Sequence, residues 1–582
     1  MIRSWKNYLF LLLFFLNLSG LSAQEKYPQD YFAPPLDITL YSSGTFGELR
    51  GNHFHSGLDI KTQGRVGLPI LAAAEGSIVR IKVSPYGFGR ALYLKHPNGY
   101  TTVYAHLHEF APEIEAYVVS EMRRKQSNEV DLFPPAAKFY FKQGEEIAKG
   151  GNSGGSGGPH LHFEIRDSRT ENIINPLLFG LKVEDHRPPE IGPMQVYYFK
   201  DGQPAGQKEY SLLNRGEGKY ELSGNGIIEA EEELSFGLYA IDKQDKTSNR
   251  NGIYELKLFV GDNLEHHFKM ETFAFAKTRY INAHIDYGLK ECCSRSSHRL
   301  YLEPGNKLST YPARAAAGHI KFDRDTIVPI RIEASDVAGN SSVLSFDLHY
   351  QKSSSLEATA DLASEANSDI NLVEVHYNLP EVLNGEDYEL GFKAGSFYRD
   401  YKIEIRKEHI NGTYSPLFNF GDRSIPVQRY FDIKLRLNHL PKGVSPSKLF
   451  IASYRDGVYD DYEGGYYQNG WISTRTRQLG QFAIAADTLA PSITASGFSN
   501  GSTIKKGTTV VVRVKDDISG VEKYNAWVDE VWVPIYYDAK TDRLLLKTEY
   551  WPEAKDSKQV LKLRVEDDRN NQSEEIWELF VS

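Results

Sequence analysis

Short apolar runs separated by glycine-rich turns fill the N-terminal third of the chain and restrict what it can fold into. Between residues 38 and 179 these runs include 78–83, 91–95, 100–104 and 161–165. Frequent short strands of this kind favour an antiparallel β domain. The pattern therefore predicts a mainly β fold for this part of the protein.

One segment interrupts the strand pattern. Residues 112–126 have helical spacing, with acidic residues early and basic residues late: Glu113, Glu115, Arg123, Arg124 and Lys125. This order of charges complements the helix dipole. We therefore expect an inserted helix.

After residue 186 the chain changes to longer β segments rich in tyrosine, valine and charged residues. Turns containing Asp and Asn precede alternating strands in an internal repeat, at residues 239–249, 333–340 and 564–571. Each resembles the last hairpin of a β-sandwich domain. Residues 487–493 also resemble the linker and first strand of a bacterial immunoglobulin-like module, and residues 515–521 fit its interior turn.

The first residues predict export. A start that contains Arg3 and Lys6 precedes an apolar run at 8–16 and small residues up to Ala23. This order is typical of a signal peptide, here residues 1–23. The run is short for a membrane span and no second span follows, so we expect no stable span after cleavage. An uncleaved anchor is the alternative, because Leu21 occupies a position that small residues usually fill.

Charge and cysteine content exclude other classes. The net charge of -10 and the pI near 6.0 provide no long-range attraction to polyanions, so nucleic acid is not an expected partner. The two cysteines, Cys292 and Cys293, are adjacent, which excludes a disulfide framework. They either form a vicinal disulfide or remain thiols, and the spacing around them makes a poor metal site.

Three separated histidine motifs could carry chemistry. In the first, His55 and Asp59 are four residues apart and can lie on one face of a strand or a helix. In the second, His160 and His162 alternate on a strand and share its polar face. The third places His106 at the end of a strand. Two histidines and one carboxylate, with an open fourth position, are a common ligand set of catalytic zinc.

At these residues the sequence resembles the lysostaphin/LytM-type family of zinc peptidases, which cleave peptidoglycan peptides. The His-x-x-x-Asp, Tyr-x-His-Leu and His-x-His signatures occur in the family's order. Supporting stretches match at 69–76, 142–149, 151–154 and 175–176. The resemblance runs from about residue 44 to 179, roughly a quarter of the chain.

The resemblance implies a role for each of the five residues. His55, Asp59 and His162 would bind Zn²⁺, and His106 and His160 would be catalytic histidines that do not bind the metal. Zinc lowers the pKa of a bound water, and a nearby imidazole can accept the proton as that water attacks a peptide carbonyl. The second imidazole or the metal can stabilise the oxyanion, and the sequence leaves open which histidine does which.

Neighbouring polar residues are weaker candidates. His53 cannot keep the four-residue spacing to Asp59, so we expect it beside the ligands or at the substrate, and we expect His108 at the surface. Glu164 shares the face of the two strand histidines and is either an orienting acceptor or a solvent-facing side chain. Arg50 and Asn52 are candidate substrate or supporting groups.

The stretch between Leu107 and Lys142 departs from the family, because it is longer than the connection expected there. The inserted helix would narrow the groove, gate access, or dock a partner. Decoration of a tolerant loop is an equal alternative.

Together these observations predict an antiparallel β-sheet peptidase domain with an inserted helix, followed by several β-sandwich, immunoglobulin-like domains. The expected boundaries are 24–186 for the peptidase, 187–352 for one or two sandwich domains, 353–368 for a linker, 369–486 for a β-rich domain and 487–582 for a final sandwich.

The expected function is a secreted zinc endopeptidase that hydrolyses peptidoglycan stem peptides or cross-links in the periplasm, the cell envelope or outside the cell. One alternative is a non-enzymatic regulator of a separate wall hydrolase, but the complete set of five residues favours catalysis. The other is a surface adhesion or assembly protein whose β modules bind a protein or a glycan. Tyrosines at 459–467 would suit a glycan-binding face, or else form a strand-edge or core cluster.

Overall fold

The computed structural model describes residues 26–312, 317–352, 371–440, 442–553 and 558–582. Most of its regular elements are strands, which confirms the mainly β class. The predicted signal peptide and the predicted linker at 353–368 lie outside the described residues. We refer to residues 26–186, 187–352, 371–486 and 487–582 as the first, second, third and fourth regions.

The first region contains two antiparallel sheets. The main path of the larger sheet runs β1-β2-β11-β6-β5-β4-β8, with β9, β12 and β21 at its sides. Its strands from the first region are β1 (Ser42–Gly44), β2 (Leu58–Lys61), β4 (Gly76–Val83), β5 (Arg90–Lys95), β6 (Tyr100–Ala105), β8 (Val130–Leu132), β9 (Tyr140–Phe141), β11 (His160–Asp167) and β12 (Ile173–Ile174). The second region adds β21 (Thr272–Phe273), which pairs with β12. The smaller sheet consists of β3 (Pro69–Leu71), β10 (Glu146–Gly150) and β7 (Leu107–Phe110). The 3-10 turn η1 (Pro176–Phe179) follows β12.

The inserted helix is α2 (Pro112–Lys125), which confirms the prediction from the charge order. Pro112 opens the first turn, where its missing N–H is not needed. The helix packs Ile114, Val118 and Met122 into the first region's core, and Val119 is buried as well.

The second region has a four-stranded and a seven-stranded sheet around a shared apolar core. The four-stranded sheet contains β13 (Glu190–Lys200), β14 (Gln203–Tyr210), β18 (Glu233–Ile241) and β22 (His298–Arg299). The seven-stranded sheet contains β15 (Leu212–Gly216), β16 (Lys219–Leu222), β17 (Ile227–Ala230), β19 (Glu255–Val260), β20 (Asn263–Lys269), β23 (Thr326–Ser335) and β24 (Ser341–Tyr350). Along the chain, β21 and β22 are connected by η2 (Phe275–Tyr280), α3 (Ile281–His284) and α4 (Tyr287–Cys293). Cys292 and Cys293 form a vicinal disulfide, the first of the two states the sequence left open.

The third region also encloses its core between two sheets. One contains β25 (Asn371–Val375), β28 (Tyr401–Glu408), β29 (Leu417–Phe420), β31 (Leu449–Arg455), β32 (Val458–Tyr462) and β35 (Gly480–Ala486), and η3 (Pro446–Lys448) precedes β31. The other contains β26 (Glu381–Asn384), β27 (Tyr388–Phe392), β30 (Phe431–Arg436), β33 (Tyr466–Gln468) and β34 (Trp471–Thr476). The tyrosines at 459, 466 and 467 are exposed on β32 and β33, which are edge strands.

The fourth region repeats this two-sheet plan around a separate core. One sheet contains β36 (Ser492–Ser496), β38 (Thr509–Lys515), β42 (Arg543–Lys547) and β41 (Tyr536–Asp538). The other contains β37 (Thr503–Ile504), β44 (Gln572–Val581), β43 (Lys558–Asp567), β39 (Val521–Val528) and β40 (Val531–Val533). The turn η4 (Thr548–Tyr550) follows β42.

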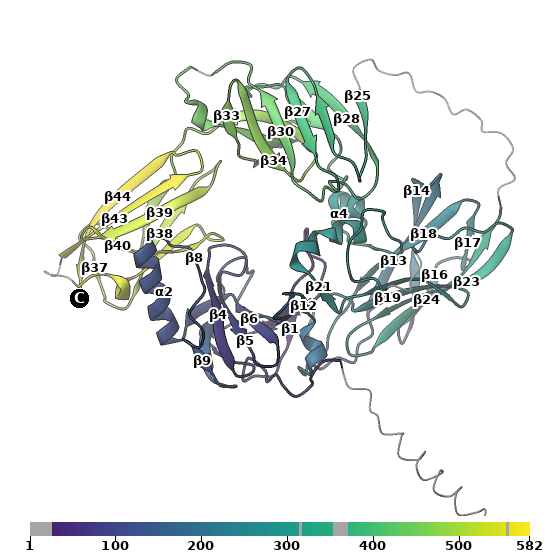
Figure 1. Ribbon diagram of the computed structural model, residues 1–582, viewed down its shortest axis with the longest axis horizontal. Coiled ribbons are helices and arrows are strands. Elements are labelled where there is room, and N and C mark those ends of the chain that lie inside the picture. The colour runs from purple at the N-terminus through teal and green to yellow at the C-terminus, as the bar shows by residue number, and fades with distance from the viewer. Residues whose placement is uncertain (1–25, 313–316, 353–370, 441, 554–557) are drawn as a thin grey trace, which may run out of the picture.

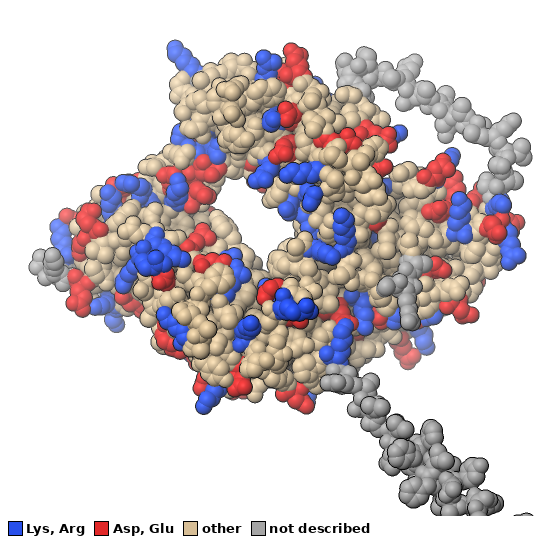
Figure 2. All heavy atoms as spheres, viewed as in Figure 1, with Lys and Arg blue, Asp and Glu red and all other residues tan. Residues whose placement is uncertain are grey.

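The four regions form a ring, because the fourth region returns to contact the first (Figure 1). Asn128, just after α2, donates to the carbonyl of Tyr524 at 2.6 Å and accepts from the amide of Ile535 at 2.8 Å. On α2 itself, Glu115 accepts from the hydroxyl of Tyr550 at 2.8 Å. The insertion is thus a docking surface for the protein's own C-terminal region. Figure 2 shows that the opening in the ring persists when all heavy atoms are drawn.

No helix in the described ranges has the length and apolar character needed to cross a membrane.

Candidate active site

Strand pairing brings two of the five predicted residues face to face. β2 and β11 are antiparallel neighbours, and Asp59 lies directly opposite His162. Opposite residues of an antiparallel pair project from the same face of the sheet. His162 Nδ1 therefore lies 2.9 Å from Asp59 Oδ1.

His55 completes the group from the loop that precedes β2. Two backbone hydrogen bonds fix the position of His55. Its N–H donates to the Glu48 carbonyl and its carbonyl accepts from the Gly47 N–H, each at 2.9 Å. His55 Nε2 lies 3.0 Å from Asp59 Oδ1 and 3.1 Å from His162 Nδ1. The three predicted ligands thus converge in a buried cluster.

Hydrogen bonds to the outer ring nitrogens set the tautomers of the two histidines. His55 Nδ1 donates to the Thr45 carbonyl at 2.8 Å, and His162 Nε2 donates to Glu164 Oε1 at 3.0 Å. In the neutral rings this leaves lone pairs on His55 Nε2 and His162 Nδ1, the two nitrogens that face each other and Asp59. With both rings neutral, three electron-rich atoms meet here, and either a metal cation or a proton on His162 relieves their repulsion.

The spacing of these atoms suits zinc. Ligands about 2.0–2.2 Å from one zinc ion at tetrahedral angles lie roughly 3.3–3.6 Å apart. The separations of 2.9–3.1 Å among His55, Asp59 and His162 need to widen by only a few tenths of an ångström. The donor set and its geometry therefore fit a zinc ion.

Glu164 lies behind His162 as an orienting acceptor, one of the two roles left open by the sequence. It is fully buried, and Arg166 Nε donates to its other oxygen at 2.7 Å. Burial disfavours the charged carboxylate, but Arg166 and His162 outweigh that effect and hold the pKa of Glu164 at about 2. A permanent carboxylate therefore fixes the ring of His162.

His106 and His160 form a second pair beside the first three residues, with ring centroids 4.7 Å apart. His160 begins β11 and shares the face of His162, as the alternation predicted. His106 follows β6 in a left-handed conformation with φ of 60°, which turns it out of the strand.

The backbone also sets the tautomers of this pair. His106 Nδ1 donates to the Ser153 carbonyl and His160 Nδ1 to the Gly158 carbonyl, both at 2.8 Å. In the neutral rings Nε2 is then the basic atom, and that of His160 lies 3.4 Å from Asp59 Oδ1.

Electrostatics separate the roles of these histidines. Burial, with His162 and His160 nearby, lowers the pKa of His106 to about 3, so this ring is neutral at pH 7. Burial also opposes protonation of His162, but its bonds to Asp59 and Glu164 prevail and raise its pKa to about 9 in the absence of metal. Burial opposes ionisation of Asp59, but His55, His160 and His162 prevail and lower the pKa of Asp59 far below its usual range. A metal ion would therefore compete with a proton at His162.

These five residues line a cavity of about 580 Å³. The glycine-rich loop at residues 150–158 contributes Gly155 and Gly157 to its wall. At Gly154, φ is +70° and an added Cβ would come within 2.4 Å of the Gly89 backbone, so only glycine fits this close approach.

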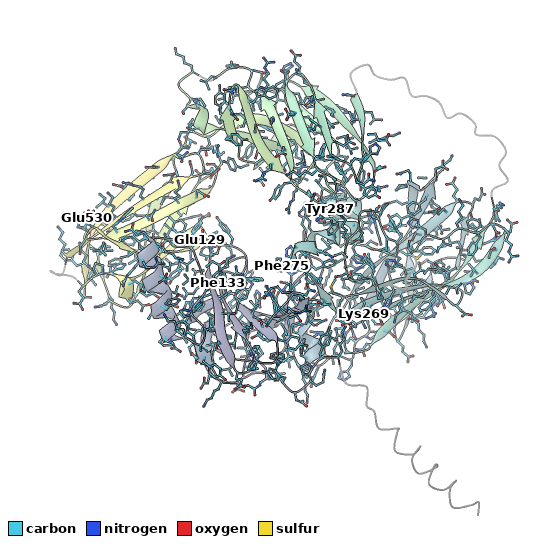
Figure 3. All side chains as sticks on the ribbon, viewed as in Figure 1. Glu129, Phe133, Lys269, Phe275, Tyr287 and Glu530 are labelled. Atoms are coloured by element: carbon cyan, nitrogen blue, oxygen red, sulfur yellow. A yellow bond between two sulfur atoms is a disulfide. The ribbon has the colours of Figure 1, made fainter. Side chains whose placement is uncertain are left out.

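Phe275 is a wall residue that the sequence analysis missed. It opens η2 in the second region and lies at the inner edge of the ring (Figure 3). Its side chain is 48% exposed and its ring lies 6.4 Å from that of Phe88, another wall residue. No local pattern marks Phe275, because it lies far along the chain from the histidine motifs and follows β21, which joins the larger sheet through β12.

The weaker candidates occupy different places. His53 and Arg50 line the cavity, and an Arg50 nitrogen lies 3.4 Å from Asp59 Oδ2. His108 lines another cavity, between the first and fourth regions. Asn52 accepts from Asn282 at 2.9 Å and thus contacts the second region.

Comparisons with known proteins cover this region. A model of peptidase family M23 matches residues 53–121. An uncharacterized metalloprotease of Haemophilus influenzae is 32% identical over 127 residues, which are 22% of this chain and 21% of the relative. The DD-carboxypeptidase/endopeptidase Mpg of Neisseria meningitidis serogroup B is also 32% identical over 127 residues, 22% of this chain and 23% of the relative. The chain thus spans about a fifth of the length of these relatives.

Solved structures and a second family model add to these findings. The catalytic domain of lysostaphin from Staphylococcus simulans is 24% identical and covers 24% of this chain and 90% of that domain, with a TM-score of 0.18. The catalytic domain of the M23 protein EnpA from Enterococcus faecalis is 22% identical and covers 26% and 98%, with a TM-score of 0.19. A Zu5-like domain model matches residues 373–487.

The family model includes His55, Asp59 and His106 and ends before β11, and one curated relative is named a metalloprotease. This chain therefore contains a peptidase domain of family M23.

Proposed function

We propose that this protein is an exported zinc-dependent endopeptidase that hydrolyses peptide bonds in peptidoglycan stem peptides or cross-links. The observation that carries the proposal is the meeting of three lone-pair atoms from His55, Asp59 and His162 beside two histidines with available Nε2 atoms. His55, Asp59 and His162 are the proposed zinc ligands. His106 and His160 are the proposed catalytic histidines.

Zinc, when bound, supplies an acidified water and a Lewis acid for the scissile carbonyl. The protein contributes orientation and proton transfer. Glu164 holds His162 in the ligand tautomer, and the carbonyls of Ser153 and Gly158 hold His106 and His160 with Nε2 toward the cavity. A neutral imidazole at this position can accept a proton from the nucleophile and later donate it to the leaving amine.

The substrate class rests on relatives. One is named DD-carboxypeptidase/endopeptidase, and another, from Vibrio cholerae, is named peptidoglycan DD-endopeptidase ShyB and is 28% identical over 111 residues. A cavity walled by glycine backbone, Phe88 and Phe275 offers hydrogen-bonding groups and apolar surface for an extended peptide. The signal peptide expected at residues 1–23 agrees with action on the cell wall.

The same proposal includes the domain division. A peptidase domain at 24–186 would be followed by one or two immunoglobulin-like sandwich domains at 187–352, a linker at 353–368, a β-rich domain at 369–486 and an immunoglobulin-like sandwich at 487–582. The third and fourth regions each have a core of their own, which supports this division, whereas Phe46, Phe54 and Ile173 of the first region pack into the core of the second.

The decisive experiment incubates purified protein with peptidoglycan and identifies the released fragments by mass spectrometry. Three arms are compared: the zinc-loaded protein, the protein with a chelator, and His162→Ala. We expect fragments from cleaved peptide bonds in the first arm only, and a His108→Ala control should behave as the wild type. Cleavage that persists in both depleted arms would refute the zinc mechanism.

An absence of cleavage in every arm, in a protein that holds one equivalent of zinc, would refute the enzyme proposal. It would favour the regulator alternative, which could then be tested by adding the protein to a separate wall hydrolase.

A further inference from the structure

A second convergence of carboxylates lies away from the histidines, where the second region begins. Asp185 precedes β13, Asp242 follows β18 and Asp336 follows β23. One carboxylate oxygen from each lies within 4.8 Å of those of the other two. Asp242 and Asp336 are 3% and 5% exposed, so two of these acids are buried.

Two buried polar side chains at this place lack partners among the described residues. Asp242 Oδ1 has no hydrogen-bond partner there. Asn251, which is 1% exposed, has none for either side-chain atom. Asp242 and Asn251 are bridge partners on antiparallel segments, so their side chains project from the same face.

Burial and repulsion between the carboxylates outweigh the attraction of Arg187 at this place. Burial, together with the neighbouring carboxylates, raises the pKa of Asp242 to about 8 and that of Asp185 to about 6. Burial also raises the pKa of Asp336. Arg187 is near, but its guanidinium lies 3.5 Å from Glu190. Buried acids without a basic partner are the environment in which a metal cation is favourable.

There is space for an ion. Asp185, Asp242 and Asp336 line a cavity of about 130 Å³ together with Gln244 and Tyr254. Its other wall comes from the first region and includes Thr45 and Asn175. Ligand oxygens about 2.3–2.6 Å from one calcium ion lie at most about 5 Å apart, which accommodates the spacing of these carboxylates.

The fourth region supplies an internal comparison. Asp487, Asp516 and Asp567 also converge there. The Asn571 side chain donates to Asp567 and to the Asp487 carbonyl. In the same way, the Asn340 side chain donates to Asp336 and to the Asp185 carbonyl. In the fourth region, however, Ser519 donates to Asp487 at 2.6 Å, and backbone amides donate to Asp516. The unpartnered buried oxygen distinguishes the second region's cluster.

We propose that Asp185, Asp242 and Asp336 bind a calcium ion. The all-oxygen donor set suits a hard cation, and Ca²⁺ accepts several protein ligands in a flexible geometry where Mg²⁺ keeps its waters. The ion ties the segment that leaves the first region to two turns of the second. It also lies beside Thr45, whose carbonyl accepts the hydrogen bond that orients His55.

The test measures calcium binding to the full-length zinc-loaded protein, so that the histidine site is occupied. Calcium-free protein is titrated with Ca²⁺ by calorimetry, and the number of bound ions is compared among variants. We expect Asp242→Asn to bind one equivalent fewer than the wild type. Asp245→Asn is the matched control, because Asp245 lies nearby but pairs with His186 at the surface, and it should bind as the wild type does.

A second variant and a second measurement distinguish loss of the calcium site from misfolding of the protein. Asp185→Asn changes the carboxylate of the incoming segment, and circular dichroism verifies the fold of both variants. Tb³⁺ bound at this cavity should give luminescence sensitised by Tyr254, and Ca²⁺ should displace it. The proposal is overturned if the wild type binds no Ca²⁺ up to about 10 mM. It is also overturned if folded Asp242→Asn and Asp185→Asn bind as many ions as the wild type.

Discussion

His162 donates from Nε2 to Glu164 across 3.0 Å, while its Nδ1 lies 2.9 Å from Asp59. A single imidazole thus connects a buried carboxylate to the proposed metal centre. Such outer carboxylates fix the ring and increase its basicity as a ligand.

Replacing this carboxylate should weaken zinc binding. We expect Glu164→Gln to lower zinc affinity by about 10-fold or more, because the neutral amide orients His162 less strongly. Competition with a calibrated chelator measures the affinity. Glu171→Gln is the control, since Glu171 also contacts Arg166 but its side chain is 60% exposed, and it should bind zinc normally. If Glu164→Gln binds zinc as tightly as the wild type does, Glu164 does not orient His162 for the metal.

The second histidine pair should affect turnover and not metal content. We expect His106→Gln and His160→Gln each to lower kcat/KM by about 10²–10⁴-fold, the usual contribution of a positioned acid or base. Zinc content, measured by atomic emission, should stay at that of the wild type. His108→Gln, two residues from His106 with a half-exposed side chain, should retain activity. Loss of zinc in either variant would assign that histidine to the metal instead.

The contact that closes the ring should depend on Asn128. Asn128→Ala leaves the Tyr524 carbonyl and the Ile535 amide without their side-chain partner. We expect this to weaken the contact by about 2 kcal/mol, as for unpaired buried polar groups. Small-angle X-ray scattering should then show a larger radius of gyration. Lys125→Ala, at an exposed position of the same helix, should leave it unchanged.

The carboxylate cluster predicts a pH dependence of stability in calcium-free protein. The pKa of Asp242 is raised to about 8 in the folded state, above its value of about 3.9 in an unfolded chain. The folded state therefore holds the proton more tightly, and unfolding releases it between these pH values. Stability attributable to Asp242 is present at low pH and is lost as the pH rises toward 8.

Asp242→Asn provides the measurement, because the amide cannot ionise. Hydrogen exchange of the β18 and β23 turns is compared in the two proteins at about pH 6.5 and pH 8, after correction for intrinsic exchange. Protection in the wild type should fall relative to the variant at the higher pH. Added Ca²⁺ should restore protection in the wild type only. A wild-type to variant ratio that does not change with pH would contradict the prediction.

Some features followed from local sequence. The alternation of His160, Leu161, His162 and Phe163 placed the two histidines on one strand face, because strand side chains repeat every two residues. The charge order of residues 112–125 indicated a helix, since its ends carry partial charges. Five site residues were named from short motifs, and the structure brings all five together around one cavity.

Other features depend on contacts between distant residues, which no local pattern encodes. The strand register sets Asp59 against His162, more than 100 residues away, and backbone carbonyls choose the histidine tautomers. Phe275 enters the site from another region, Asn128 joins α2 to the fourth region, and Asp185, Asp242 and Asp336 meet from three separate turns. The sequence by itself determined which strands and which reactive side chains this protein has. Only tertiary packing decided which of them meet, because burial and pairing energies arise when sheets far apart in the chain come together.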